Sequence, residues 1–359
     1  MVGEHGRKLE TIRAWMAEHN LGALYLQTVG SFAWATCGAS SSIIRSSTNG
    51  LACLLITRER KYLITSNIEA PRLENEEKMA AQGWEFVVTP WFESQLPVTQ
   101  LSRGMQLGSD GPYPGAVNLS VEIARARASL SPEEGTRFRE LGKRRAQAMH
   151  TATLAVRPGE TEHEIGARLV AEAERLGVQA ITNLIATDER IRLYRHPLPT
   201  GKKLARYAML VLCGRRDGLV CSLTRLVHFG ALPDELRRKA AACMQVDATF
   251  IKSTRPGERL GDIFEKAVSS YATSGYPGEW KLHHQGGAAG YEPREYLAVP
   301  GSPDVVSAGQ VYAWNPSITG VKSEDTILVG KTGNEILTEM PGWPVTVVEG
   351  IPTPSILVV

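Results

Sequence analysis

The sequence predicts a two-domain α+β protein, with a smaller α/β domain over residues 1–130 and a larger, duplicated domain over residues 131–359. Three observations predict this. The chain has 359 residues, enough for two domains at roughly 150 residues each. A strong helix start at residue 131 marks a boundary. Beyond it, one four-residue motif occurs twice, each time between two segments of helical pattern.

The first domain shows short apolar segments that alternate with turn residues. A helix is expected near Leu9–His19, followed by an apolar strand at Ala23–Leu26. Leu51–Thr57 and Tyr62–Thr65 predict a hairpin across residues 58–61. No catalytic constellation is visible in this part of the chain.

The second domain begins with a clear helix signal. Ser131 is a good N-cap residue, Pro132 suits the first helical turn, and Glu134 completes a capping box. The apolar spacing that follows predicts a long helix through Met149.

An internal repeat follows from two Arg-Pro-Gly-Glu blocks, at residues 157–160 and 255–258. Ile165 and Ile263 each lie eight residues after the Arg of their block, inside a segment of helical pattern. The first of these helices has its own capping box, Thr161 with Glu164. Duplication predicts two halves related by a pseudo-twofold axis, closing on one cleft that takes residues from both.

Composition is that of an ordinary water-soluble protein, with 43% hydrophobic and 22% charged residues. A net charge of +2 gives no strong attraction to nucleic acid or to membranes. No apolar run approaches the roughly 20 residues that span a bilayer, and the N-terminus lacks a signal-peptide core. Five scattered cysteines without CxxC spacing indicate a reducing compartment, so we expect a cytoplasmic protein.

Four segments in a fixed order carry a family resemblance. They are Arg-His-Pro-Leu-Pro at 195–199, the strand 217–225, the stretch 284–293 beginning His-Gln-Gly-Gly, and Asn-Pro-Ser with Gly-Val-Lys-Ser-Glu-Asp-Thr within 315–326. In this order they resemble the pita-bread-fold family of methionine aminopeptidases, prolidases, Xaa-Pro aminopeptidases and creatinase. Residues 1–130 are similar to the N-terminal domain of the prolidase and creatinase branch. The resemblance implies a pita-bread second domain and a homodimer.

The resemblance also implies five metal-ligand positions, and most have lost their ligand. In order they hold Cys213 or Val211, Ser222, His284, Asn315 and Glu324. The first position is ambiguous because the hairpin around residues 216–218 is about two residues shorter than the family's. A dinuclear site needs several carboxylates to offset about four positive charges, and three of the five ligands lack that chemistry. We therefore expect no metal ligands and no cofactor.

The remaining catalytic candidates are His284, Glu324, Tyr291 and His196. Imidazole can shuttle a proton without metal, so His284 is expected as general acid and base, with Glu324 fixing its orientation. The alternative is that His284 is a relic held by Glu324 or a backbone carbonyl. Tyr291 stands where the family has a second catalytic His and is expected to donate to an oxyanion. His196 matches the family's substrate-side His, and two glycines after His284 would let substrate approach the backbone.

Five further residues are expected to bind substrate. Arg294 would clamp a carboxylate, and Asn315 would recognise a polar group. Ser222 replaces a carboxylate. Arg225, beside it on one strand, is either a substrate contact or a buried structural partner. His283 is the weaker of the two adjacent histidines because neighbouring residues on a strand face opposite ways.

These residues predict a metal-independent, creatinase-like hydrolase, or a related C–N bond enzyme, acting on a small amino-acid-like or short-peptide substrate. Creatinase, within the resembled family, hydrolyses a C–N bond without metal. Two alternatives stay open: a metal-dependent Xaa-Pro peptidase with an altered site, and a non-catalytic protein that binds a peptide or partner. No nucleic acid or membrane partner is expected.

Overall fold

The computed structural model describes residues 3–93 and 97–359. The chain separates into two compact units, Met1–Arg127 with Asp217–Leu219, and Ala128–Arg216 with Val220–Val359. The segment Asp217–Leu219, grouped with the first unit, is the tip of a hairpin whose two strands belong to the second unit. Asp217 and Gly218 form a two-residue turn there, with φ of 49° and 77°. No helix in the described ranges is both long and apolar enough to cross a membrane.

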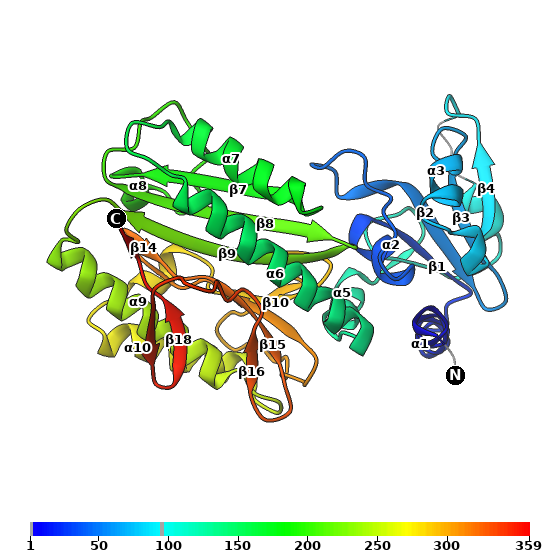
Figure 1. Ribbon diagram of the computed structural model, residues 1–359. Helices are drawn as coiled ribbons and strands as arrows, with labels where there is room; N and C mark the ends of the chain where they lie inside the picture. Colours follow the sequence, from blue (N-terminus) through cyan, green and yellow to red (C-terminus); the bar gives the residue numbers. More distant parts are fainter. Residues whose placement is uncertain (1–2, 94–96) are drawn as a thin grey trace. The chain divides into compact units, whose positions relative to one another are not determined.

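The first unit is built on a six-stranded mixed sheet of order β4-β3-β2-β1-β5-β6 (Figure 1). Its strands are β1 Ala23–Thr28, β2 Asn49–Thr57, β3 Lys61–Ser66, β4 Glu85–Thr89, β5 Leu107–Ser109 and β6 Val117–Asn118. Its helices are α1 Glu4–Glu18, α2 Val29–Ala35, α3 Ala70–Asn75, η1 Ala80–Gln82, α4 Val98–Leu101 and α5 Ser120–Ala128. The expected hairpin is confirmed, because β2 and β3 pair antiparallel with Leu54 opposite Leu63.

The first half of the second unit is a helix pair against a sheet. Its elements are α6 Pro132–Leu154, α7 Glu162–Arg175, β7 Gln179–Thr187, α8 Arg190–Leu193, β8 Tyr207–Arg216 and β9 Leu219–His228. With β19 Leu357–Val358 the strands form a sheet of order β19-β9-β8-β7, and α6 and α7 run along it (Figure 1). Both expected capping boxes are present, at Ser131 with Glu134 and at Thr161 with Glu164.

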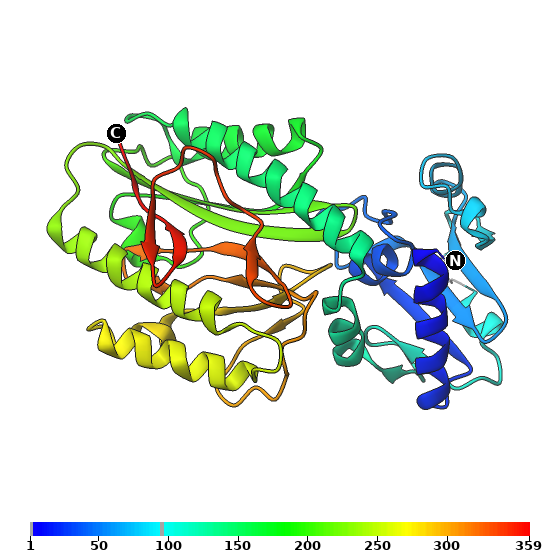
Figure 2. The same ribbon diagram turned by 60° about the horizontal axis from the view of Figure 1, so that its bottom comes forward.

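The second half repeats this plan. Its helices are α9 Asp234–Ser253, α10 Leu260–Thr273 and the short η2 Glu279–Leu282. A five-stranded sheet of order β11-β10-β12-β15-β16 follows, made of β10 Gly286–Ala289, β11 Tyr296–Leu297, β12 Val311–Trp314, β15 Asp325–Val329 and β16 Asn334–Ile336. Two small ribbons complete it: β13 Ser317–Ile318 with β14 Val321–Lys322, and β17 Val345–Val348 with β18 Ile351–Pro354. Figure 2 shows α9 and α10 side by side on this half.

Matching backbone hydrogen bonds support the duplication. Gly159 and Gly257, in the two Arg-Pro-Gly-Glu blocks, have φ of 91° and 92°, a left-handed conformation that favours glycine. Gly159 N–H donates to Leu204 O at 2.8 Å, and Gly257 N–H donates to Val306 O at 2.9 Å. Each block therefore begins the second helix of its half and is tied at the same point to a returning chain.

The two sheets of the second unit meet where β9 approaches β15. Thr224 N–H donates to Glu324 O at 3.2 Å, and Ser222 N–H donates to Thr326 Oγ1 at 3.2 Å. A core of aromatic and aliphatic side chains fills the space beneath the second sheet, including the stacked rings of Phe250 and Trp314. Residues from both halves are thereby held around one point.

Candidate active site

A small cavity, lined by apolar, ionisable and amide side chains, lies where the two halves meet. Its volume is about 270 Å³. The lining comprises Thr182, Leu184, His196, Val211, Cys213, His284, Pro293, Arg294, Asn315, Lys322 and Glu324. Five of the nine expected site residues are brought together here: His196, His284, Arg294, Asn315 and Glu324. The size suits a molecule near that of an amino acid or a dipeptide.

A larger cavity of about 750 Å³ lies elsewhere, between α6 and the segment around Met340. None of the expected site residues lines it. The small cavity is the better candidate for chemistry because its ionisable and amide groups converge.

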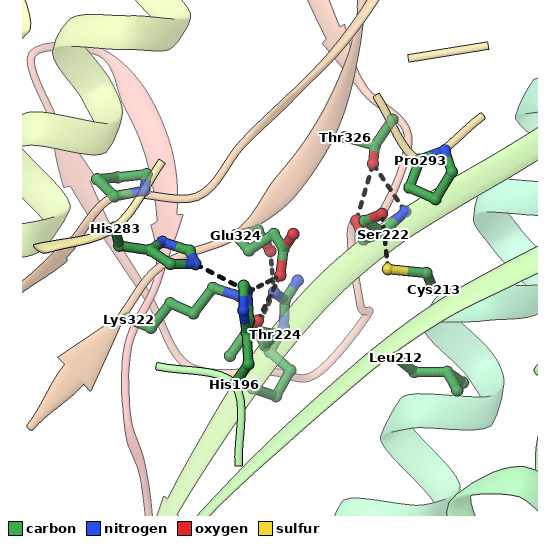
Figure 3. Close-up of polar contacts among 12 residues, drawn as sticks. His196, Leu212, Cys213, Ser222, Thr224, His283, Pro293, Lys322, Glu324 and Thr326 are labelled. Atoms are coloured by element: carbon green, nitrogen blue, oxygen red, sulfur yellow. Dashed lines mark hydrogen bonds and ion pairs between the residues drawn. The ribbon is translucent and has the colours of Figure 1, made fainter. Parts of the chain in front are cut away.

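Glu324 is the only carboxylate among the described lining residues, and both of its oxygens are engaged. Oε2 lies 2.9 Å from Lys322 Nζ and accepts a 2.6 Å hydrogen bond from Thr224. Oε1 accepts from Arg294 Nη2 at 3.1 Å. Burial alone would raise the pKa of Glu324, but the charges of Lys322 and Arg294 outweigh it and hold the pKa well below its usual range. The contacts shown in Figure 3 therefore favour the ionised form of this buried carboxylate.

Three imidazoles gather at one side of the cavity. His283 Nε2 and His196 Nε2 lie 3.0 Å apart, and the rings of His283 and His284 are centred 4.4 Å apart. Burial and the nearby Lys322 lower the pKa of His283 to about 2 and that of His196 below its usual value. Burial and the Arg294 charge lower the pKa of His284 to about 4. All three rings are consequently neutral near pH 7.

The expectation that His283 faces away from His284 is wrong. Alternation applies to a regular strand, but β10 begins only at Gly286, and His283 lies in a bend after η2. The two rings are therefore free to lie on the same side, and His283 points toward His196 (Figure 3).

The expected pairing of His284 with Glu324 is also absent. No hydrogen bond joins the two side chains within residues 3–93 and 97–359, and His284 Nδ1 is buried there without a protein partner. The Glu324 oxygens are instead engaged by Lys322 and Thr224 on one side and by Arg294 on the other, and neither oxygen accepts from the imidazole. His284 is thus neither oriented by Glu324 nor a relic held by it.

Cys213 and Ser222 face each other across β8 and β9. Ser222 Oγ donates to Cys213 Sγ at 3.2 Å, which makes Cys213, not Val211, the partner of the second lost ligand position (Figure 3). Ser222 is 1% exposed and does not line the cavity, so its expected role in substrate binding is not supported by its position.

Two further expectations are corrected by burial. Tyr291 is fully buried, and its hydroxyl donates to Glu134 on α6 and does not reach the cavity, so it has no access to an oxyanion there. Arg225 is 3% exposed and forms an ion pair with Asp325 at 2.8 Å. Arg225 is thus the buried structural partner that was the alternative in the sequence analysis.

The glycines after His284 are needed for packing and do not open the backbone to substrate. A Cβ on Gly286, whose φ is 108°, would lie 2.2 Å from Ala313 O, and one on Gly287 would lie 2.2 Å from Tyr296 O. Both positions are filled by neighbouring strands of the same sheet. Close approach of a strand, not of a ligand, explains these residues.

Lys322 and Thr224 are site residues that the sequence analysis did not single out. Lys322 is only 8% exposed, and a lysine is rarely buried to this extent unless it is paired with an anion. The signal was available, because Lys322 and Glu324 are two residues apart and neighbours at that spacing share a face of an extended segment.

The cavity residues do not fit a dinuclear metal centre. Among the described residues there is one carboxylate, whose oxygens bind two cationic side chains, and the other four ligand positions hold a thiol, a hydroxyl, an imidazole and an amide. Two divalent ions would bring about four positive charges next to Lys322 and Arg294 with little to offset them.

The duplicated halves and their shared cavity define a pita-bread fold. The model of metallopeptidase family M24 matches residues 136–331, more than half of the chain. The chain therefore belongs to metallopeptidase family M24.

Several relatives match this chain, some of them over nearly its full length. A putative dipeptidase, YkvY, of Bacillus subtilis (strain 168) is 20% identical over 93% of this chain and 98% of its own. The prolidase from Pyrococcus horikoshii OT3 superposes with a TM-score of 0.79 at 19% identity, covering 93% of this chain and 98% of its own. The Xaa-Pro dipeptidase from Bacillus anthracis superposes with a TM-score of 0.79 at 18% identity, covering 99% of this chain and 100% of its own. At these identities the two structures support the fold alone.

Proposed function

We propose that this protein hydrolyses the C–N bond of a short peptide or peptide-like amide without a dinuclear metal centre. The family and the names of the relatives favour a peptide substrate over a creatine-like one. The observation that carries metal independence is the Glu324 carboxylate, whose oxygens are bound by Lys322 and Arg294.

The cavity favours a substrate with an anionic end. Its lining carries two cations, Arg294 and Lys322, against one carboxylate. Among the described residues, Arg294 Nε has no hydrogen-bond acceptor and Asn315 Oδ1 has no hydrogen-bond donor. A free carboxylate of a short peptide matches the first group, and an N–H of the peptide matches the second.

His284 is the group that moves the proton in this proposal. It is neutral near pH 7 and lines the cavity, so it can accept the proton of a water whose oxygen bonds to the amide carbon. The guanidinium of Arg294 lies in the same cavity and would offset the charge on the amide oxygen. The C–N bond then breaks, and His284 returns the proton to the leaving nitrogen, giving an acid and an amine.

The proposal is tested by treating the protein with a chelator and then measuring its turnover of a set of dipeptides with free carboxylates, including Xaa-Pro dipeptides. Turnover should persist, and His284→Ala should lower kcat by about 10²–10⁴-fold. His163→Ala is the matched control, because His163 is exposed on α7 and outside the cavity. Turnover that requires added Mn²⁺ or Co²⁺ would favour the metal-dependent Xaa-Pro peptidase, which the relatives' names support.

A non-catalytic binding protein is the second candidate. The observation that favours it is His284 itself, since no described residue orients its imidazole. Calorimetry that detects dipeptide binding, together with no turnover in the same samples, would decide for this candidate.

We also propose a cytoplasmic location and a homodimer. None of the five cysteines forms a disulfide in the described residues, which fits a reducing compartment. The homodimer is proposed from the resemblance to the pita-bread family, and sedimentation measures it directly.

A further inference from the structure

We propose that His196, His283 and His284 bind a single transition-metal ion of the zinc type, and that this ion inhibits hydrolysis. The site differs from the family's dinuclear centre because it uses three imidazoles and no carboxylate. Of the three, only His284 stands at a family ligand position.

The spacing of the three rings fits one ion. One nitrogen from each ring can be chosen so that all three lie within 4.8 Å of one another. Tetrahedral zinc with Zn–N bonds of about 2.0–2.1 Å needs nitrogens about 3.4 Å apart. The Nε2 atoms of His196 and His283, 3.0 Å apart, are already near that spacing, and binding would draw the nitrogen of His284 toward them.

The backbone that carries the rings is held in place. Arg195, next to His196, forms a 2.8 Å ion pair with Glu279 of η2, which ties the His196 loop to the turn that carries His283. Gln285 Nε2 donates to His283 O at 2.7 Å, and Tyr271 donates to Gln285 Oε1 at 2.8 Å. A site on braced segments is preorganised, which lowers the entropy cost of binding.

The ligand type selects the metal. Imidazole suits Zn²⁺, Cu²⁺ and Ni²⁺, whereas Mg²⁺, Ca²⁺ and Mn²⁺ prefer oxygen ligands. Lys322 and Arg294 both oppose a cation here, and Glu324, which binds both of them, offsets their charge only in part. Three neutral ligands leave the charge of the ion uncompensated, so an anion such as hydroxide or a carboxylate should take the fourth position.

Inhibition follows because an imidazole lone pair bound to a metal cannot accept a proton from water. This consequence rests on the proposed function, in which His284 is the base. The binding itself does not rest on it, so calorimetry and activity can fail separately.

Binding is tested by titrating the chelator-treated full chain with ZnCl₂ in a calorimeter. A second titration with CoCl₂ is monitored by the visible absorption of bound cobalt. We expect one ion per chain. His283→Ala and His196→Ala should each weaken binding by more than about tenfold, whereas His163→Ala should bind like the parent. His196 is exposed, so its variant keeps the test valid if His283→Ala fails to fold.

No binding by the parent chain, or equal binding by all variants, would overturn the proposal. In the activity arm, Zn²⁺ should abolish dipeptide turnover and a chelator should restore it. Activation by Zn²⁺ with binding lost in His283→Ala would keep the ion site, but it would overturn its inhibitory role and the metal-independent reaction.

Discussion

Lys322 Nζ lies 2.9 Å from Glu324 Oε2, and the two side chains are 5% and 3% exposed. Arg294 binds the other oxygen of the same carboxylate. A single buried anion thus neutralises two buried cations only in part. We expect this triad to stabilise the cavity wall and, because its positive charges outnumber its negative one, to favour an anionic ligand.

Removing the anion should cost more than removing one cation. Glu324→Gln leaves Lys322 and Arg294 buried without a counter-ion and should lower the free energy of unfolding by about 3–5 kcal/mol. Lys322→Met leaves Glu324 paired with Arg294 and should cost less. Urea unfolding of both variants measures the order. As a control, Lys266→Ala in the exposed pair with Glu258 should cost less than about 1 kcal/mol.

Tyr291 should matter for stability and not for chemistry. Its hydroxyl donates to Glu134, the residue that closes the capping box of α6. Tyr291→Phe should therefore lower the free energy of unfolding by about 1–3 kcal/mol and leave kcat unchanged. A kcat loss comparable to that of His284→Ala would return Tyr291 to the list of catalytic residues.

Asp247 should make stability fall as pH rises. Burial raises the pKa of Asp247 to about 7, and the nearby Asp325 and Glu324 act in the same direction against Ser323 and Arg225. Between about pH 4 and pH 7 the folded chain keeps a proton that the unfolded chain releases. In this window Asp247 therefore makes the free energy of unfolding decrease as pH rises.

Asp247→Asn removes that contribution while keeping an acceptor for the 2.6 Å hydrogen bond from Ser323. The variant should gain stability relative to the parent as pH increases through the window. Urea unfolding at about pH 4 and about pH 8 measures the difference. A constant difference between the two chains would show that Asp247 does not titrate there.

Local chemistry made much of the fold predictable. The capping boxes at Ser131 and Thr161 depend on residues three apart, so both helix starts could be derived from the sequence. The repeat was visible for a similar reason, since Gly159 and Gly257 sit in identical blocks with the same backbone requirement.

The site was only partly predictable, because its contacts join distant segments. Tyr291 and Glu134 are 157 residues apart, and no local pattern links them. Resemblance alone placed Tyr291 at the reacting centre. His283 was undervalued because strand alternation was applied to a bend, and the gathering of three imidazoles depends on the return of the chain at residue 196.

The central claim is that hydrolysis proceeds without the dinuclear centre of the family. The most direct test is the turnover of a dipeptide by protein whose metal content has been reduced below one ion per two chains, as measured by elemental analysis. The account predicts unchanged kcat in that sample and no gain on adding Mn²⁺ or Co²⁺. Loss of turnover on metal removal, with recovery at two ions per chain, would contradict it.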